Sequence, residues 1–140
     1  MVRPVPFRFP VEVRYLEVDR QGVVFNMWYL AYFDEAWTAF LEAGGLPYAQ
    51  MLADGYDVQL VHTEVDWHAP LGFSMPAEAR VGVARIGRSS VTVQFEVWSG
   101  SMAVASASTV YVVVPVGAAT SVEVPARLRQ ALGPLAPLRA

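Results

Sequence analysis

A long apolar helix is encoded near the start of the chain and limits the folds open to it. Residues 27–42 contain no proline or glycine, and Gly44 and Gly45 follow as a stop signal. Asn26 stands just before the segment and is a residue type that favours the N-cap position. The apolar side chains cover more than one stripe, and they are Met27, Trp28, Leu30, Ala31, Phe33, Ala36, Trp37, Phe40 and Leu41. Such a helix needs burial on several sides.

Strands are predicted on both sides of this helix. Before it, residues 9–18 are rich in β-branched and aromatic residues and end at the polar turn of residues 19–22. After a short predicted helix over 47–53, apolar stretches separated by turn residues indicate four strands, over 58–67, 77–86, 91–98 and 102–114. One more short helix is predicted over 126–132.

This order of elements predicts a single domain over residues 1–140, of the α+β class, with an antiparallel sheet wrapped around one long central helix. A chain of this size can bury a core without disulfides or metals. One small sheet covers only part of an apolar helix, and the edge of the sheet needs protection. We therefore expect a homodimer or homotetramer in which a second copy completes the burial.

The composition argues against several kinds of function. The sequence has no cysteine, which rules out disulfides and cysteine nucleophiles, and its two histidines predict no metal site. A formal net charge of -3 disfavours nucleic acid as a partner. The uncharged segment 97–122 is interrupted by serines, Pro115 and Gly117, and so predicts a buried strand, not a membrane helix. Because the N-terminus has no signal-peptide pattern, we expect a cytoplasmic protein.

Asp19 is the carboxylate best placed for catalysis. It lies between the first predicted strand and the long helix, whose start offers unpaired backbone N–H groups that can polarise a carbonyl. From there a carboxylate can activate water or attack the carbonyl carbon itself. An aspartate shortly before a glycine is also common in turns without any catalytic role. Both interpretations stay open on this evidence.

Three motifs occur in a fixed order. The first has Asp19, then Gly22-Val23-Val24-Phe25, then a helix rich in tyrosine and phenylalanine; the second is Val65-Asp66-Trp67-His68-Ala69-Pro70; the third is Ile86-Gly87-Arg88-Ser89-Ser90. In this order they resemble the motifs of the 4-hydroxybenzoyl-CoA thioesterase family, which has the hotdog fold. The resemblance covers roughly residues 8–114. It departs from the family at residues 71–76, which lack a Tyr-Gly-Asp-like turn, and at Trp37, where relatives commonly carry arginine.

The resemblance implies an enzyme that hydrolyses an acyl-CoA thioester to a free acid and coenzyme A. Asp19 takes the place of the family's nucleophile or general base, and Asn26 that of the residue whose backbone N–H faces the thioester carbonyl. We expect further substrate contacts at Gly22, Val23, Tyr29, Pro70, Arg88, Ser89 and Ser90. Coenzyme A is then part of the substrate, and no separate cofactor is expected.

The turn at residues 87–90 offers an arginine and backbone N–H groups, which suit the phosphates of coenzyme A. It can also be an ordinary hairpin turn with a solvated Arg88. Arg85 is a second basic candidate, while structural roles are expected for His62 and His68 because no partner stands at metal-ligand spacing.

Two other functions stay open. A hydratase or dehydratase of the same fold would use a histidine with an acid, but neither histidine follows the first predicted strand or lies on the long helix. A non-catalytic acyl-thioester binding protein would leave Asp19 without a chemical role. Asp34 and Glu35, inside the long helix, either face solvent or approach the site across a subunit boundary.

Overall fold

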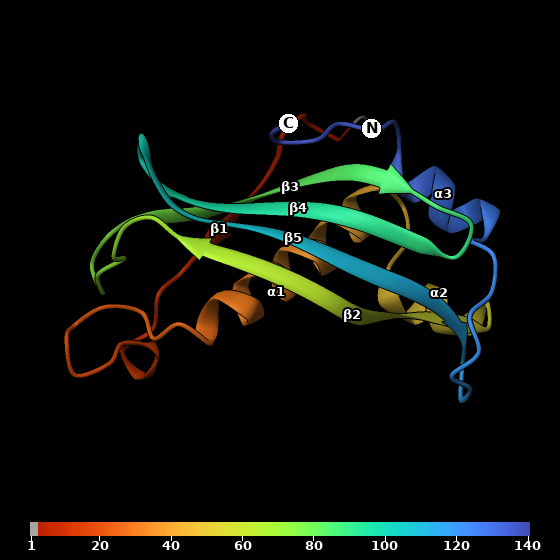
Figure 1. The fold of residues 1–140 in the computed structure, drawn as a ribbon, viewed down its shortest axis with the longest axis horizontal. Helices are drawn as coiled ribbons and strands as arrows, with labels where there is room; N and C mark the ends of the chain where they lie inside the picture. The colour runs from red at the N-terminus through yellow and green to blue at the C-terminus, as the bar shows by residue number, and fades with distance from the viewer. Residues whose placement is uncertain (1–2) are drawn as a thin grey trace.

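A computed structural model describes residues 3–140 as one antiparallel sheet with helices (Figure 1). The strands of the described chain are β1 (Phe7–Val11), β2 (Tyr56–Trp67), β3 (Ala77–Ile86), β4 (Ser90–Ser99) and β5 (Met102–Pro115), in the order β1-β3-β4-β5-β2. The α-helices are α1 (Trp28–Ala43), α2 (Tyr48–Ala53) and α3 (Ala126–Leu132), and a 3-10 turn, η1, spans Tyr15–Glu17. The antiparallel sheet confirms the predicted fold class. Within residues 3–140, no helix is both long and apolar enough to cross a membrane.

The first strand is shorter than the sequence predicts. A single strand over residues 9–18 is wrong, because β1 ends at Val11 and η1 follows before Val18 makes an isolated bridge to Val24. Val11 pairs with Ala77, the first residue of β3, so the chain beyond Val11 has no strand to pair with. Loss of the pairing partner ends the strand, although the sequence stays rich in β-branched residues.

The start of α1 also differs from the prediction. Its N-cap residue is Met27, with no side-chain cap hydrogen bond, so the assignment of the N-cap to Asn26 is wrong. Met27 already has helical dihedral angles (φ -68°, ψ -24°), unlike the extended backbone of a side-chain cap. A turn leads into the helix instead, since the Trp28 N–H donates to the Phe25 carbonyl at 3.0 Å.

Aromatic packing holds α1 along one face of the sheet (Figure 1). Phe33 stacks on Phe95 of β4 with ring centroids 5.1 Å apart, and Trp37 stacks on Tyr111 of β5 at 4.7 Å. The buried residues of α1 are Tyr29, Tyr32, Phe33, Ala36, Trp37, Phe40 and Leu41. The opposite side exposes Leu30, Asp34, Glu35, Thr38 and Glu42. Within one chain α1 is thus amphipathic. That the sheet wraps around α1 as a central helix stays a prediction.

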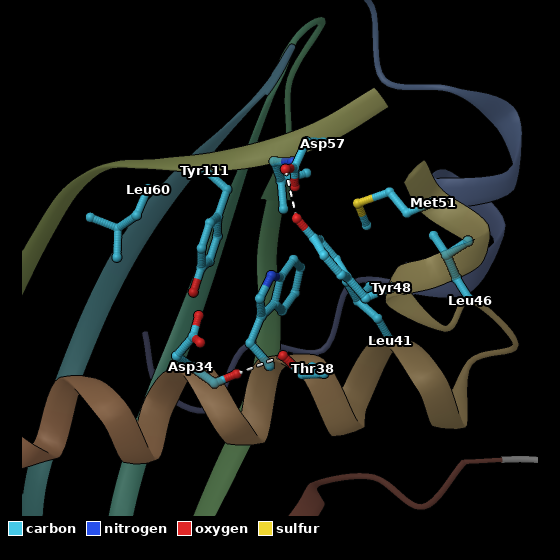
Figure 2. A pocket seen from close by; sticks show the side chains of 11 residues that line it. Asp34, Thr38, Leu41, Leu46, Tyr48, Met51, Asp57, Leu60 and Tyr111 are labelled. Carbon is cyan, nitrogen blue, oxygen red and sulfur yellow. Dashed lines mark hydrogen bonds between the residues drawn. The ribbon is translucent and has the colours of Figure 1, made fainter. Parts of the chain in front are cut away.

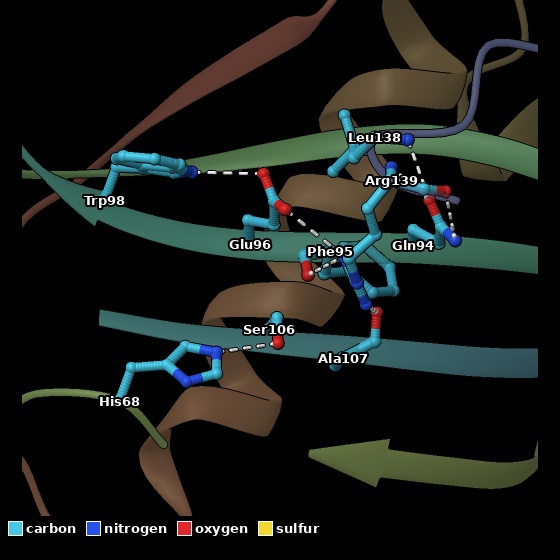
Figure 3. Close-up of polar contacts among 9 residues, drawn as sticks. All are labelled: His68, Gln94, Phe95, Glu96, Trp98, Ser106, Ala107, Leu138 and Arg139. Atoms are coloured by element: carbon cyan, nitrogen blue, oxygen red, sulfur yellow. Dashed lines mark hydrogen bonds and ion pairs between the residues drawn. The ribbon is translucent and has the colours of Figure 1, made fainter. Parts of the chain in front are cut away.

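The C-terminal tail lies on the sheet face opposite α1 and is bound to β4 (Figures 1 and 3). The Gln94 side-chain oxygen accepts the N–H groups of Leu138 and Arg139 at 2.7 and 3.1 Å. The guanidinium of Arg139 donates to the Phe95 carbonyl at 3.3 Å and pairs with Glu96 at 3.4 Å. These bonds anchor the end of the chain on the sheet.

Gly82 of β3 allows this close approach of the tail. A Cβ atom there would overlap the carbonyl oxygen of Ala136. The N–H of the same Ala136 donates to the Val83 carbonyl, which holds the tail at this position. We expect Gly82→Ala to lower the free energy of unfolding by about 1–3 kcal/mol, as overpacking does. Urea denaturation measures the change.

A chain ending at Gly133 is the control for this substitution. Without the tail nothing overlaps the new methyl group, so Gly82→Ala should then cost less than about 0.5 kcal/mol, the ordinary range for a harmless change. Equal losses in the full and shortened chains would contradict the explanation.

Candidate active site

Residues 18–25, which we call the Asp19 loop, form a small hairpin between η1 and α1. The Asp19 N–H donates to the Val23 carbonyl at 2.8 Å, and the Gly22 N–H donates to the Asp19 carbonyl at 2.9 Å. Gly22 has a φ of 79°, a left-handed conformation that glycine adopts without strain. The turn chemistry of the loop therefore fixes the backbone at Asp19.

The Asp19 carboxylate is oriented by one hydrogen bond and keeps one oxygen free. Its Oδ1 accepts the N–H of Gln21 at 2.7 Å, which is an Asx turn. Among residues 3–140 its Oδ2 accepts no hydrogen bond, and the residue is partly exposed. One oxygen thus holds the side chain in place while the other can meet a reactant. The turn role and a chemical role are compatible.

The segment after β2 covers one side of the Asp19 loop. The Val24 N–H donates to the Leu71 carbonyl at 2.9 Å, and Val23 makes a bridge to Gly72. Pro70 directly precedes this contact. The predicted residues Asp19, Gly22, Val23 and Pro70 therefore belong to one cluster of two joined loops.

Tyr29 brings α1 to the same cluster. It is buried in the first turn of the helix and packs edge-on against Trp67 at the end of β2, with ring centroids 6.3 Å apart. Burial raises the pKa of Tyr29 to about 12, so its hydroxyl stays protonated at neutral pH. Asn26 is exposed at the entrance to the helix, and its backbone N–H makes no hydrogen bond within the described chain. A free N–H at the positive end of a helix suits a developing oxyanion.

Glu17 lies two residues before Asp19, and the sequence does not indicate it as a candidate for the site. Its carboxylate is only 3% exposed and is fully hydrogen-bonded. Oε1 accepts the Arg14 backbone N–H at 3.0 Å and the Tyr32 hydroxyl at 2.7 Å, while the Arg14 Nε and Nη2 groups each reach Oε2 at 2.8 Å. Burial alone would raise the pKa of Glu17, but these donors from Arg14 and Tyr32 lower it below its ordinary value. Glu17 is thus a buried anion with complete pairing.

The turn between β3 and β4 lies at the end of the sheet opposite the Asp19 loop of the same chain (Figure 1), and it includes Arg88, Ser89 and Ser90. The ten residues of β3 separate this turn from the Asp19 end, which is roughly 30 Å at about 3.3 Å per residue. The Val113 and Val124 N–H groups donate to the carbonyls of Ser89 and Arg88 at 2.9 and 2.7 Å. The turn therefore has a structural role, and its exposed Arg88 side chain does not meet Asp19 within one chain.

The remaining candidates make local contacts. His68 Nε2 lies 2.9 Å from the Ser106 hydroxyl on the outer face of the sheet (Figure 3), and His62 pairs with Glu64 at 3.1 Å. Both histidines are exposed, as is Arg85. No group of three histidine or acidic side chains within residues 3–140 could hold a metal ion.

A pocket of about 380 Å³ lies between α1, α2, β2 and β5 (Figure 2). Its apolar walls are Trp37, Leu41, Leu46, Met51, Val58 and Leu60. Two acidic groups line it: the Asp34 carboxylate faces the Tyr111 hydroxyl (Figure 2), and Asp57 accepts the Tyr48 hydroxyl at 2.8 Å. Burial and the nearby Asp34 raise the pKa of Tyr111. We call this cavity the Asp34 pocket.

Residues 13–132 match the family model of the thioesterase-like superfamily. The chain belongs to the thioesterase-like superfamily. A curated relative from Aquifex aeolicus (strain VF5), whose name gives esterase as a provisional activity, is 30% identical over 118 residues, which is 84% of this chain and 92% of the relative.

Solved structures show the same fold. The crystal structure of a hypothetical protein from Aquifex aeolicus has a TM-score of 0.86 and 30% identity, covering 91% of this thioesterase-like chain and 99% of that one. A 1,4-dihydroxy-2-naphthoyl-CoA thioesterase from Synechocystis has the same fold, with a TM-score of 0.82 at 19% identity over 90% of this chain and 94% of that one. The hotdog fold inferred from the motifs is thus confirmed.

Glu17 makes a testable contribution to stability that depends on pH. Because its pKa is lowered in the folded state, the stabilisation is present above the unfolded-state pKa and is lost as the pH falls through the folded-state value. We expect Glu17→Gln to lower the free energy of unfolding by about 2 kcal/mol at pH 7, the loss expected for hydrogen bonds to a charged group. Urea denaturation at pH 7 and at progressively lower pH measures both proteins.

The difference between wild type and Glu17→Gln should shrink on acidification, because a protonated glutamate resembles glutamine. Exposed Glu123 supplies the control, since Glu123→Gln should change stability little at any pH. A constant difference between wild type and Glu17→Gln across the range would contradict the role of the charge.

Proposed function

We propose that this thioesterase-like protein hydrolyses an acyl-CoA thioester to a free acid and coenzyme A, with Asp19 as the catalytic carboxylate. The observation that carries the proposal is an oriented carboxylate with one free oxygen, on the loop that leads into the unpaired backbone N–H of Asn26 at the start of α1. The family assignment and the CoA thioester named for the Synechocystis relative support the substrate class.

Asp19 can act in two ways from this position. As a general base, Oδ2 takes a proton from water while the water oxygen adds to the thioester carbon; the C–S bond then breaks and the thiolate of coenzyme A leaves. As a nucleophile, Oδ2 itself adds to the carbon, the thiolate leaves, and water hydrolyses the resulting anhydride. In both routes the Asn26 N–H and the helix dipole stabilise the oxyanion.

We also propose that the enzyme is a homodimer joined through β2. This strand is at the edge of the sheet, is twelve residues long, and leaves Leu60, Val61 and Trp67 about half exposed, at 52%, 56% and 51%. A long edge strand that exposes large apolar side chains invites pairing with another strand. Twofold pairing of β2 with a second copy, in antiparallel register, would cover it and enclose the exposed side of α1.

Such a dimer accounts for the distance between Asp19 and Arg88. In antiparallel pairing, the Trp67 end of one β2 lies beside the Tyr56 end of its partner. The Asp19 loop of one subunit would then approach the Tyr56 end of the partner's sheet, which carries the Asp34 pocket and the Arg88 turn. We propose that the acyl group uses this pocket and that Arg88, Ser89 and Ser90 bind the coenzyme A portion.

Asp19→Asn separates the turn role of this residue from its chemistry. The asparagine oxygen can still accept the Gln21 N–H, so the turn should persist, but the base or nucleophile is gone. We expect turnover to fall roughly 10²–10⁴-fold, measured as thiol release from a panel of acyl-CoAs. Glu78→Gln, which changes a carboxylate that pairs with Arg80 within β3, should keep full turnover.

Two outcomes would overturn the assignment. Near wild-type turnover in a folded Asp19→Asn protein would exclude Asp19 as the catalytic group. A wild-type protein that binds acyl-CoAs without releasing thiol would instead be an acyl-thioester binding protein.

Val61→Lys tests the dimer, because a lysine at the centre of the edge strand opposes strand pairing by charge repulsion and solvation. Sedimentation should give the wild type twice the chain mass of 15.4 kDa, or a multiple of it, and the variant the mass of one chain. Leu135→Lys changes an equally exposed residue of the tail, at 56%, and should leave the mass unchanged. A monomeric wild type at micromolar concentration would refute the proposal.

A further inference from the structure

We propose that Glu17 is a positioning residue that sets the Asp19 carboxylate against the start of α1; this inference rests on the proposed thioester hydrolysis. Glu17 is two residues from Asp19, and within residues 3–140 it makes no hydrogen bond to the free Asp19 oxygen or to the Asn26 N–H. Glu17 acts through its bonds to the Asp19 loop, which carries the Asp19 carboxylate, and to α1, which begins just after the Asn26 N–H.

The side chain of Glu17 is tied to α1. It accepts the hydroxyl of Tyr32 at 2.7 Å, and its partner Arg14 lies over the ring of Trp28 at 5.9 Å. Trp28 and Tyr32 are four residues apart, so they lie one above the other on a single face of the first helical turns. The Arg14–Glu17 pair therefore contacts the N-terminal turns of α1, where the oxyanion would form.

The backbone of Glu17 is tied to the loop. Its carbonyl accepts the Phe25 N–H at 2.9 Å, and the next residue, Val18, begins the Asp19 loop and bridges to Val24. The two ends of the loop thus meet at Glu17. One residue consequently holds the loop closed through its carbonyl and holds the helix through its carboxylate.

Glu17 cannot itself be the reacting group. Its side chain is 3% exposed. Oε1 accepts two hydrogen bonds, while Oε2 accepts one from Arg14 Nε and forms an ion pair with Arg14 Nη2 at 2.8 Å. A carboxylate has about four acceptor sites, so none is left for water or substrate. Its effect on the reaction must come from geometry, and a displacement of about 1 Å at a reacting group can cost roughly 10²-fold in rate.

Tyr32→Phe tests the inference because it removes one donor to Glu17 and leaves the ring packing of α1 in place. We expect kcat for acyl-CoA hydrolysis to fall roughly 10- to 100-fold with KM within about twofold, since the misplaced group acts in the transition state. Glu17→Gln should lower kcat in the same way. Both variants are assayed well below their unfolding temperatures.

Tyr56→Phe is the matched control. Tyr56 is also buried, at 5% exposed, and its hydroxyl has no hydrogen-bond partner within residues 3–140, so the same atom is removed without loss of a bond. Its kcat and KM should equal those of the wild type. Equal losses of kcat in the two tyrosine variants, or a rise in KM with kcat unchanged for Tyr32→Phe, would overturn the positioning role.

Hydrogen exchange supplies a readout that does not need activity. The Phe25 amide, bonded to the Glu17 carbonyl, should exchange at least about tenfold faster in Tyr32→Phe than in wild type or Tyr56→Phe, because local opening of the loop becomes easier. Unchanged exchange would refute the inference. If the wild type releases no thiol while Phe25 exchange responds as expected, the proposed reaction fails and the structural tie of Glu17 to the loop stands.

Discussion

The stacking of α1 on the sheet is the contact that gives every other part of this structure its place. Phe33 on Phe95 and Trp37 on Tyr111 fix the helix along the strands, so that its first turn lies at the end of the sheet where β2 finishes. Tyr29 then meets Trp67, and the chain entering the helix must pass beside the segment after β2. The Asp19 loop forms there because both of its flanking elements are already fixed.

The sequence predicts the regular elements well because their signals are local. The alternation of apolar and polar residues in β4, the glycine stop after α1 and the turn residues between the strands are read from neighbouring residues, and the structure has these elements with nearly the predicted bounds. The end of β1 is not a local property. It depends on where β3 begins, at Ala77, far along the chain from Val11, and no pattern within residues 9–18 records that.

The same error hides Glu17. In a continuous strand, residues 14 and 17 point to opposite faces, so an Arg14–Glu17 pair would not be expected. In a 3-10 turn, residues three apart come onto one side, and the pair forms with both charged groups in contact. The turn at Asp19 has a strong local signal, whereas motif order assigns Arg88 only to the coenzyme A end of the substrate and carries no information on the roughly 30 Å of β3 between the two residues.

Two carboxylates two residues apart thus have opposite environments, and the difference follows from the backbone. At Glu17 the 3-10 turn directs the side chain inward to Tyr32, where burial is tolerable only because hydrogen bonds from Arg14 and Tyr32 and the ion pair with Arg14 satisfy the charge. At Asp19 the hairpin directs the side chain outward, and a single backbone N–H orients it. A carboxylate whose oxygens are all hydrogen-bonded is held rigidly but cannot react. A carboxylate with one free oxygen can react, but other residues must fix its position. In the proposed reaction the loop separates these requirements between the two residues: Glu17 bears the cost of burying a charge and orders the site, and Asp19 keeps one oxygen for the substrate.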